Sequence, residues 1–302
     1  MTFEPSYLKL NDSGQLGERI DKLNRVLESC ELCPRKCGVN RLNGQKGYCN
    51  SGKELVISSY GPHFGEEPEL VGEYGSGAIF LTNCNLLCVY CQNYEISHFS
   101  DGYEASIDEV ADLMLRLQNK GCHNVNFVTP THYAPQLVKS IKAAAERGLK
   151  IPIVWNCSGY ENVEIIKMLD GIVDIYMPDI KYSKSEHAKK YSNAPDYFER
   201  CTESVLEMHR QVGDLKVNER GVALRGLVIR HLVLPNNLAG SENVLRFISD
   251  EVSRDSYVNI MAQYRPCGKA SEFAELSRTP TIAEYSKVVD LAKKLGLHRG
   301  FR

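Results

Sequence analysis

Three cysteines that lie close together constrain this chain more than any other sequence feature. Cys84, Cys88 and Cys91 are separated by three and two residues and directly follow the apolar segment 77–83. Cysteine thiolates are the usual ligands of iron–sulfur clusters, and three local thiolates can hold three of the four irons of a cubane. The fourth iron is then open to a ligand from outside the protein. The competing interpretation is that the three cysteines are inert, buried small hydrophobic residues.

A second set of cysteines lies near the amino terminus. Cys30, Cys33, Cys37 and Cys49 are separated by two, three and eleven residues, with turn-forming proline and glycine residues between them. This pattern predicts a metal site. Its metal is either a structural zinc held by four thiolates or a second iron–sulfur cluster. Paired C-x2-C motifs would favour zinc, but the set contains one such motif, so both metals stay open.

Composition argues against several classes of function. The chain has 302 residues, a net charge of −2 and 25% charged residues, so no basic surface for nucleic acid or an anionic membrane is indicated. The segment Met1–Tyr7 lacks the basic and apolar regions of a signal peptide. No apolar stretch approaches the ~20 residues that span a bilayer. Seven of the eleven cysteines fall in the two sets, which favours metal ligation over disulfide bonds. We expect a cytoplasmic protein.

Strand-like and helical segments alternate from about residue 77 onward. Alternation of this kind builds parallel sheets, and six strands are too few for an eight-stranded barrel. We therefore predict an α/β fold, with an incomplete (β/α)6 barrel over residues 61–302 and an active site at the carboxyl ends of its strands. A helix and a small cysteine-rich metal-binding module precede it, over residues 1–60. The candidate strands are Ala78–Thr82, Asn124–Val128, Pro152–Asn156, Val173–Met177, Leu227–Val233 and Val258–Ala262.

Two helices have recognisable starting signals. Ser106–Glu109 and Thr281–Glu284 both read as capping boxes, in which a hydroxyl and a carboxylate three residues apart bond to each other's backbone N–H groups. Further helical segments are expected at 136–147, 163–169, 197–212 and 242–252, each with apolar residues on one face.

The spacing of Cys84, Cys88 and Cys91, with an aromatic residue before the last cysteine, resembles the signature of the radical S-adenosylmethionine (SAM) superfamily. Within that superfamily, the chain resembles the branch related to pyruvate formate-lyase activating enzyme, and most closely its longer relatives with an amino-terminal four-cysteine motif. The matching stretches are Gly61–Pro68, Cys84–Asn93, Thr129–Tyr133, Trp155–Gly159, Pro178–Tyr182, Arg230–Pro235 and Asn259–Pro266.

The resemblance implies a radical SAM oxidoreductase. Cys84, Cys88 and Cys91 would hold a [4Fe-4S] cluster whose open iron binds SAM. The reduced cluster would cleave SAM to a 5′-deoxyadenosyl radical, which abstracts hydrogen from a substrate. Related activating enzymes take that hydrogen from a glycine of a partner enzyme, and flavodoxin or ferredoxin supplies the electron. Two alternatives are a radical SAM enzyme that modifies another peptide or a small metabolite, and a non-catalytic electron carrier with two clusters.

The same resemblance assigns residues near the adenine and amino group of SAM. Tyr90 would lie beside the adenine, unless it is an ordinary packing residue. Related enzymes carry a Gly-Gly-Glu segment after the second strand, which holds the amino group. This chain has Thr129–His132 there instead, so a backbone carbonyl or the hydroxyl of Thr129 or Thr131 would take that role.

Later strands supply the remaining SAM contacts that the resemblance implies. Asn156 and Ser158 stand where the family has Thr-Asn-Gly and would bond the ribose. Asp179 and Lys181 match a family Asp-x-Lys and would hold the ribose hydroxyls and the carboxylate, unless they form a surface ion pair. Arg230 is a further carboxylate partner, because its planar guanidinium pairs bidentately.

Other polar residues receive less specific interpretations. His132 and His231 are expected to be structural, because hydrogen abstraction by a radical needs no general base. Glu66 and Glu67 either line the mouth of the barrel or lie in a solvated turn. Among the four scattered cysteines, Cys157 is the one expected to face the cavity.

Overall fold

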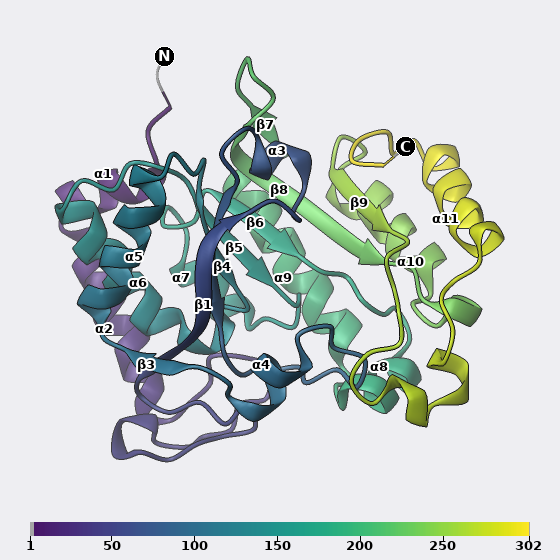
Figure 1. The fold of residues 1–302 in the computed structure, drawn as a ribbon, viewed down its shortest axis with the longest axis horizontal. Helices are drawn as coiled ribbons and strands as arrows, with labels where there is room; N and C mark the ends of the chain where they lie inside the picture. The colour runs from purple at the N-terminus through teal and green to yellow at the C-terminus, as the bar shows by residue number, and fades with distance from the viewer. Residues whose placement is uncertain (1–2, 302) are drawn as a thin grey trace.

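Six parallel strands form the centre of the structure, a computed structural model that describes residues 3–301 (Figure 1). They belong to a nine-stranded sheet, and each parallel strand pairs with the next one along the chain. The parallel strands are β2 (Ser76–Leu81), β4 (Val125–Val128), β5 (Ile153–Cys157), β6 (Ile175–Pro178), β8 (Ala223–Leu232) and β9 (Tyr257–Met261).

Each of these strands overlaps one of the six segments predicted from the sequence. Every residue of β5 and β6 is buried, as expected for parallel strands that are covered on both faces. The observed order also follows the rule that successive strand–helix–strand units add neighbouring parallel strands. The α/β class is thereby confirmed.

Three further strands run antiparallel to their neighbours and were not predicted. β1 (Leu55–His63) pairs with β2, β3 (Tyr103–Ala105) pairs with β1, and β7 (Lys216–Val217) pairs with β8. The sequence of β1 ends in Gly61-Pro62-His63, and glycine and proline are depleted in strands, which explains the omission. The predicted boundary at residue 60 falls inside this strand.

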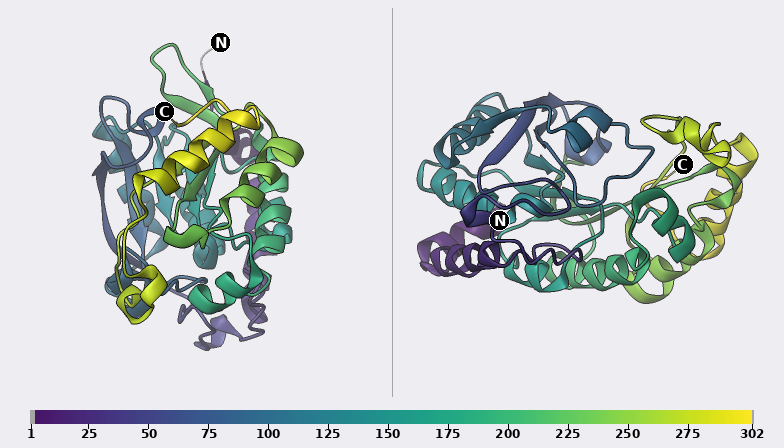
Figure 2. Two further views of the ribbon diagram at one scale, coloured as in Figure 1. Left: turned by 90° about the vertical axis from the view of Figure 1, so that its right-hand side faces the viewer. Right: turned by 90° about the horizontal axis from the view of Figure 1, so that it is seen from below.

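Helices lie outside the curved sheet (Figures 1 and 2). Both predicted capping boxes are formed: Ser106 and Glu109 bond reciprocally at the start of α5, and Thr281 and Glu284 do so at the start of α11. The helices are α1 (Ser6–Asp12), α2 (Gln15–Arg25), α3 (Pro68–Val71), α4 (Tyr94–Phe99), α5 (Ile107–Asn119), α6 (Ala134–Glu146), α7 (Val163–Met168), α8 (Ser185–Ser192), α9 (Tyr197–Val212), α10 (Ser241–Phe247) and α11 (Ile282–Lys294).

The amino-terminal cysteine segment packs at the carboxyl ends of the parallel strands. Arg41, which is 1% exposed, donates to the carbonyl of His132 (2.6 Å), just beyond β4. Asn50 donates to the hydroxyl of Ser100 (3.3 Å), at the end of α4. Segments far apart in sequence therefore meet at the edge of the sheet where an active site is expected.

Within residues 3–301, every helix is too short or too polar to span a bilayer.

Candidate active site

A cavity of about 420 Å³ opens at the carboxyl ends of the parallel strands. Its volume lies in the range of small-molecule and cofactor sites. Glu66 lines the cavity, which agrees with the mouth of the barrel rather than a solvated turn. Cys157 also lines the cavity. The predicted site residues that line the cavity are Cys84, Cys88, Cys91, Tyr90, Thr129, Asn156, Ser158, Asp179, Lys181 and Arg230.

The loop that carries Cys84, Cys88 and Cys91 follows β2 and turns sharply. Asn83 and Leu87 adopt positive φ angles of 68° and 53°, which are uncommon for residues other than glycine. Such local strain is typical of functional loops. Each cysteine sulfur accepts a hydrogen bond: Cys84 from the Leu86 N–H (3.3 Å), Cys88 from the Ser192 hydroxyl (3.0 Å) and Cys91 from the Ser97 hydroxyl (3.3 Å).

The surroundings of Cys84 and Cys88 raise the pKa values of their thiols. Burial, with a smaller effect from the neighbouring Cys88, raises the pKa of the Cys84 thiol to about 12. Burial also raises the pKa of Cys88, although Lys181 opposes the shift. Buried thiols of this kind lose their protons readily when a cation binds them. Three cysteine sulfurs in one cavity, each with a hydrogen-bond donor, are a donor set suited to an iron–sulfur cluster.

Within residues 3–301, no three cysteine, histidine, aspartate or glutamate side chains converge as the ligands of a single metal ion do. A cubane presents separate irons to its thiolates, so its ligands need not meet at one point.

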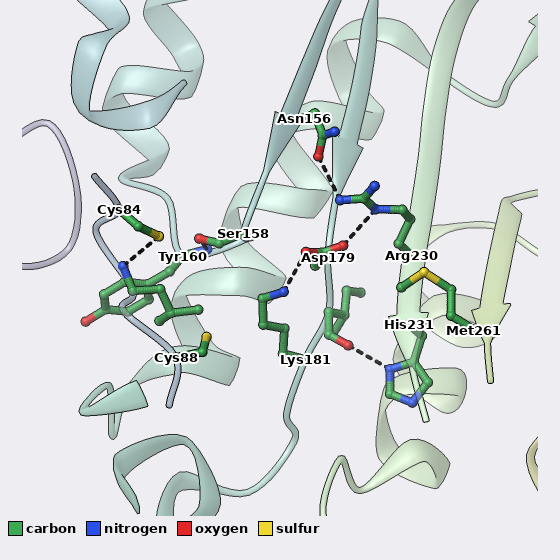
Figure 3. A network of polar contacts seen from close by, with 12 residues as sticks. Cys84, Cys88, Asn156, Ser158, Tyr160, Asp179, Lys181, Arg230, His231 and Met261 are labelled. Atoms are coloured by element: carbon green, nitrogen blue, oxygen red, sulfur yellow. Dashed lines mark hydrogen bonds and ion pairs between the residues drawn. The ribbon is translucent and has the colours of Figure 1, made fainter. Parts of the chain in front are cut away.

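A chain of alternating charges crosses the cavity (Figure 3). Asp179 accepts from Lys181 Nζ (2.6 Å) and from Arg230 Nε (2.8 Å). The same guanidinium donates to Asn156 Oδ1 (2.7 Å) and lies 3.2 Å from Glu66 Oε2. The side chains of Asp179 and Lys181 are 14% and 17% exposed, so they do not form a surface ion pair.

These partners keep the central groups charged. Burial by itself raises the pKa of Asp179, but Arg230 and Lys181 outweigh it and hold the pKa below its ordinary value. Burial by itself lowers the pKa of Lys181, and Asp179 outweighs that effect, so the pKa is raised. The pKa of Glu66 is raised, chiefly by burial. The cavity thus presents largely buried charges, which act more strongly on a bound polar molecule than charges in bulk water do.

The two threonines proposed to replace the Gly-Gly-Glu contact lie in different places. Thr129 lines the cavity and adopts a φ of 63°, which is a strained conformation for a β-branched residue. Its N–H donates to the carbonyl of Asn156 (2.8 Å). Thr131 is buried outside the residues that line the cavity, and its hydroxyl donates to Glu161 (2.8 Å). Of the two threonines, Thr129 lines the cavity and Thr131 does not.

Tyr90 both lines the cavity and packs against other aromatic rings. Its side chain is buried, and its ring meets those of Tyr182 and Tyr264 edge to face, with centroids 6.2 Å and 5.7 Å apart. Such packing fixes the orientation of the ring. The position of Tyr90 is compatible with both a contact to the adenine and an ordinary packing role.

Both histidines have the structural contacts expected of them. His132 Nε2 lies 2.8 Å from the carbonyl of Thr82. His231 lies between the carbonyl of Ile180 (2.6 Å from Nδ1) and the hydroxyl of Ser241 (2.8 Å from Nε2). Neither is among the residues that line the cavity. Burial lowers their pKa values, to about 3 and about 4 respectively, so both rings are neutral at neutral pH.

We expect acidification to destabilise the fold through His231. In the folded chain its pKa is lowered to about 4, whereas in the unfolded chain it returns to about 6.5. Protons then bind the unfolded state first, so the free energy of unfolding falls as the pH drops from 6.5 toward 4. The slope is at most roughly 1.4 kcal/mol per pH unit. Denaturant unfolding of a His231→Gln variant should show a shallower dependence on pH. A variant in which exposed His298 is replaced by glutamine is the control. Equal dependence of the unfolding free energy on pH in the unaltered protein, the His231 variant and the His298 variant would contradict the prediction.

Cys30, Cys33, Cys37 and Cys49 lie outside the residues that line the cavity, and within residues 3–301 no three of them converge as the ligands of a single metal ion do. Burial raises the pKa of the Cys33 thiol, and the nearby Cys49 and Cys30 thiols raise it further. Cys37 Sγ accepts from the N–H of Tyr48 (3.3 Å).

Only glycine fits at position 47, because a Cβ atom added there would stand 2.8 Å from the sulfur of Cys37. The backbone at Gly47 therefore packs directly against the Cys37 side chain, which only glycine permits.

Sequence reasoning missed the hydroxyl donors to the cluster loop. Ser192 lies 104 residues from Cys88, and no local pattern connects the two. Ser97 lies six residues from Cys91, on the short helix α4 that was not predicted. Glu66 could have been found from the sequence, because it belongs to a pair of adjacent acidic residues, Glu66 and Glu67, that precede α3 and the first parallel strand.

A parallel sheet with thiols and buried charged groups at the carboxyl ends of its strands is typical of cofactor-dependent α/β enzymes. The model of the Radical SAM superfamily matches residues 78–248, more than half of the chain, and the chain belongs to this superfamily. Membership implies a [4Fe-4S] cluster and SAM as cofactors.

Two relatives from Methanocaldococcus jannaschii match nearly the whole chain. Uncharacterized protein MJ0674 is 32% identical over 291 residues, which cover 92% of this chain and 78% of that protein. Uncharacterized protein MJ0808 is 22% identical over 302 residues, which cover 93% of this chain and 81% of that protein.

A solved structure, that of a radical SAM methyltransferase from Sphaerobacter thermophilus, has a similar fold. The TM-score is 0.50 at 15% identity, over 74% of this chain and 66% of that chain, just under two thirds of its length. At this identity the likeness concerns the fold alone.

Proposed function

We propose that Cys84, Cys88 and Cys91 hold the [4Fe-4S] cluster and that the rest of the cavity holds SAM. The observation that carries the proposal is that one cavity contains these three thiols together with the charge network centred on Asp179. We interpret the six parallel strands around it as the incomplete (β/α)6 barrel of this superfamily.

The residues of the chain would bind and orient these cofactors, while the cofactors, when bound, supply the electron and the hydrogen-abstracting radical. The carboxylate of Asp179 would accept from ribose hydroxyls. Lys181 and Arg230 offer cationic donors to a carboxylate. Asn156 and Ser158 add neutral hydrogen-bonding groups at the end of the neighbouring strand. Tyr90 and Thr129 complete the proposed contacts, and the burial of the network keeps water away.

The substrate that we propose is a glycine of a partner enzyme, so that the protein acts as a glycyl-radical activating enzyme. The resemblance to pyruvate formate-lyase activating enzyme supports this choice. A different peptide or a small metabolite is the alternative. Members of the superfamily need a reductant, and we propose flavodoxin or ferredoxin as the electron donor.

The electron-carrier alternative is disfavoured by the charge network. A non-catalytic carrier has no need for a SAM pocket, and Asp179, Lys181, Asn156 and Arg230 would then share no role. The structure brings all four into direct contact within one cavity, which supports an enzyme that binds a small polar molecule.

Anaerobic reconstitution tests the proposed chemistry. The reconstituted protein is mixed with dithionite and SAM, and the products are analysed for 5′-deoxyadenosine. Its formation is expected. A cluster-loaded protein that binds SAM weakly and yields no 5′-deoxyadenosine would favour the electron carrier instead.

We also propose that Cys30, Cys33, Cys37 and Cys49 hold a second metal centre, either zinc or an iron–sulfur cluster. The grouping of buried Cys33 with Cys30 and Cys49, and the N–H donor to Cys37, support it. Thiolates in such a group need a cation to offset their charges.

The second centre is expected to load independently of the first. A variant with Cys84, Cys88 and Cys91 all replaced by alanine should retain zinc or iron, because its amino-terminal cysteines are untouched. Metal analysis of the purified variant provides the measurement. A folded variant without metal would contradict the prediction.

A further inference from the structure

Arg35 projects from the amino-terminal cysteine module onto the loop of the first cysteine set. It lies between Cys33 and Cys37 in sequence, yet it contacts residues 50 to 158 positions away. Among the described residues its guanidinium has no carboxylate partner at salt-bridge distance, as the ion pairs within residues 3–301 show. Its bonds go to backbone carbonyls instead.

Three carbonyl oxygens accept from the Arg35 guanidinium. Nε donates to Asn85 (3.1 Å), one terminal nitrogen donates to Ser192 (2.9 Å), and the other donates to Asn193. Asn85 is a fully buried residue between Cys84 and Cys88. Ser192 and Asn193 form the end of α8, where helix carbonyls lack partners within the helix. One planar group therefore joins two separate segments.

Both segments adjoin the cysteines of the first set, because Ser192 bonds to Cys88 and Asn85 directly follows Cys84. The hydroxyl of Ser192 donates to Cys88 Sγ (3.0 Å), and the carbonyl of Tyr191 accepts from the N–H of Val89 (2.9 Å). The amide of Asn85 donates to the carbonyl of Tyr160 (2.6 Å). Movement of α8 or of Asn85 would consequently displace the sulfur atoms.

Two aromatic rings hold Arg35 in this position. The guanidinium carbon lies 3.9 Å from the ring centroid of Tyr48 and 5.1 Å from that of Tyr160. Tyr48 directly precedes Cys49, and its N–H donates to Cys37. Cation–π contacts of this kind add to the hydrogen bonds and suit arginine better than lysine. Arg35 is thereby positioned by Tyr48 of the cysteine module together with Tyr160, which follows β5.

We propose that Arg35 is a positioning residue through which the amino-terminal cysteine module sets the geometry and reduction potential of the cluster held by Cys84, Cys88 and Cys91. The proposal rests on the proposed function. Reduction potentials of iron–sulfur clusters depend on nearby charge and on hydrogen bonds to sulfur. Arg35 supplies a positive charge and supports the Ser192 donor. Its loss should therefore make the potential more negative.

The test compares Arg35→Ala and Arg35→Lys with the exposed neighbour Lys36→Ala, whose side chain pairs loosely with Glu31. The midpoint potential and the SAM-dependent change in the electron paramagnetic resonance spectrum are measured on reconstituted protein. Both Arg35 variants should show a more negative potential and an altered spectrum. The rate of 5′-deoxyadenosine formation at limiting reductant should fall by about tenfold. Lys36→Ala should match the unaltered protein.

The lysine variant separates position from charge, because lysine keeps the charge but cannot reach three carbonyls at once. An unaltered potential and spectrum in Arg35→Ala would overturn the proposal, as would full rescue by Arg35→Lys. Metal analysis must show that the amino-terminal centre is retained, since its loss would assign Arg35 to the folding of the module alone. If the unaltered protein forms no cluster or no 5′-deoxyadenosine, the proposed function fails instead.

Discussion

Replacing Cys88 by alanine is expected to abolish SAM cleavage. Cys88 is a buried cysteine of the loop, and its sulfur lies between the Ser192 hydroxyl and the charge network of Lys181. A cubane that keeps two of its three protein ligands has lost the arrangement that leaves a single iron open. We expect no 5′-deoxyadenosine above background and loss of the cluster spectrum. The same result is expected for Cys84→Ala and Cys91→Ala.

The matched control is Cys122→Ala. Cys122 is also a buried free cysteine, but it does not line the cavity. Its replacement removes the same atoms and should leave SAM cleavage intact, apart from a modest loss of stability. Retention of activity in Cys88→Ala would contradict the assignment of Cys84, Cys88 and Cys91 as cluster ligands. Equal loss in Cys122→Ala would indicate general damage to the fold.

Local patterns predicted the parallel strands and the capped helices well. The apolar runs that became β5 and β6 are buried on all sides, and hydrophobic runs bounded by turn residues are the strongest signal of such strands. Capping boxes are local as well, because both partners lie within four residues. By contrast, β1 contains glycine and proline, and its strand character comes from pairing with β2, which local propensity does not encode.

The lining of the cavity was predictable for a topological reason. Residues at the carboxyl ends of successive parallel strands must converge, so Asn156, Asp179 and Arg230 were brought together by the order of the strands alone. Thr131 lies outside the cavity lining, because the chain turns at Thr129 into a short 3-10 helix. This turn directs the Thr131 hydroxyl toward Glu161. A one-residue change in direction of this kind has no signature in the sequence.

Contacts between distant loops were beyond prediction. The bonds from Arg35 to Asn85, Ser192 and Asn193 involve backbone carbonyls, which every residue carries. No side-chain type marks the acceptors, so a sequence pattern cannot reveal the pairing.

Asp179→Ala is expected to weaken SAM binding by at least roughly tenfold, where each 1.4 kcal/mol corresponds to one decade. Asp179 is the common partner of Lys181 and Arg230, which it holds at 2.6 Å and 2.8 Å. Its removal leaves two buried cations without their shared carboxylate, and truncating one member of a buried charge pair typically costs about 2–5 kcal/mol. The freed side chains would also lose the positions from which we propose that they contact SAM.

Cluster content should be unchanged, because no thiolate is altered. Calorimetric measurement of SAM affinity on anaerobic, cluster-replete protein is therefore the appropriate readout. Asp112→Ala is the control, since Asp112 forms an exposed ion pair with Arg147, and such pairs contribute little. A dissociation constant that is unchanged in Asp179→Ala would show that the charge network does not contact SAM. The network would then have to serve the substrate or the fold, because its burial alone requires that the charges be paired.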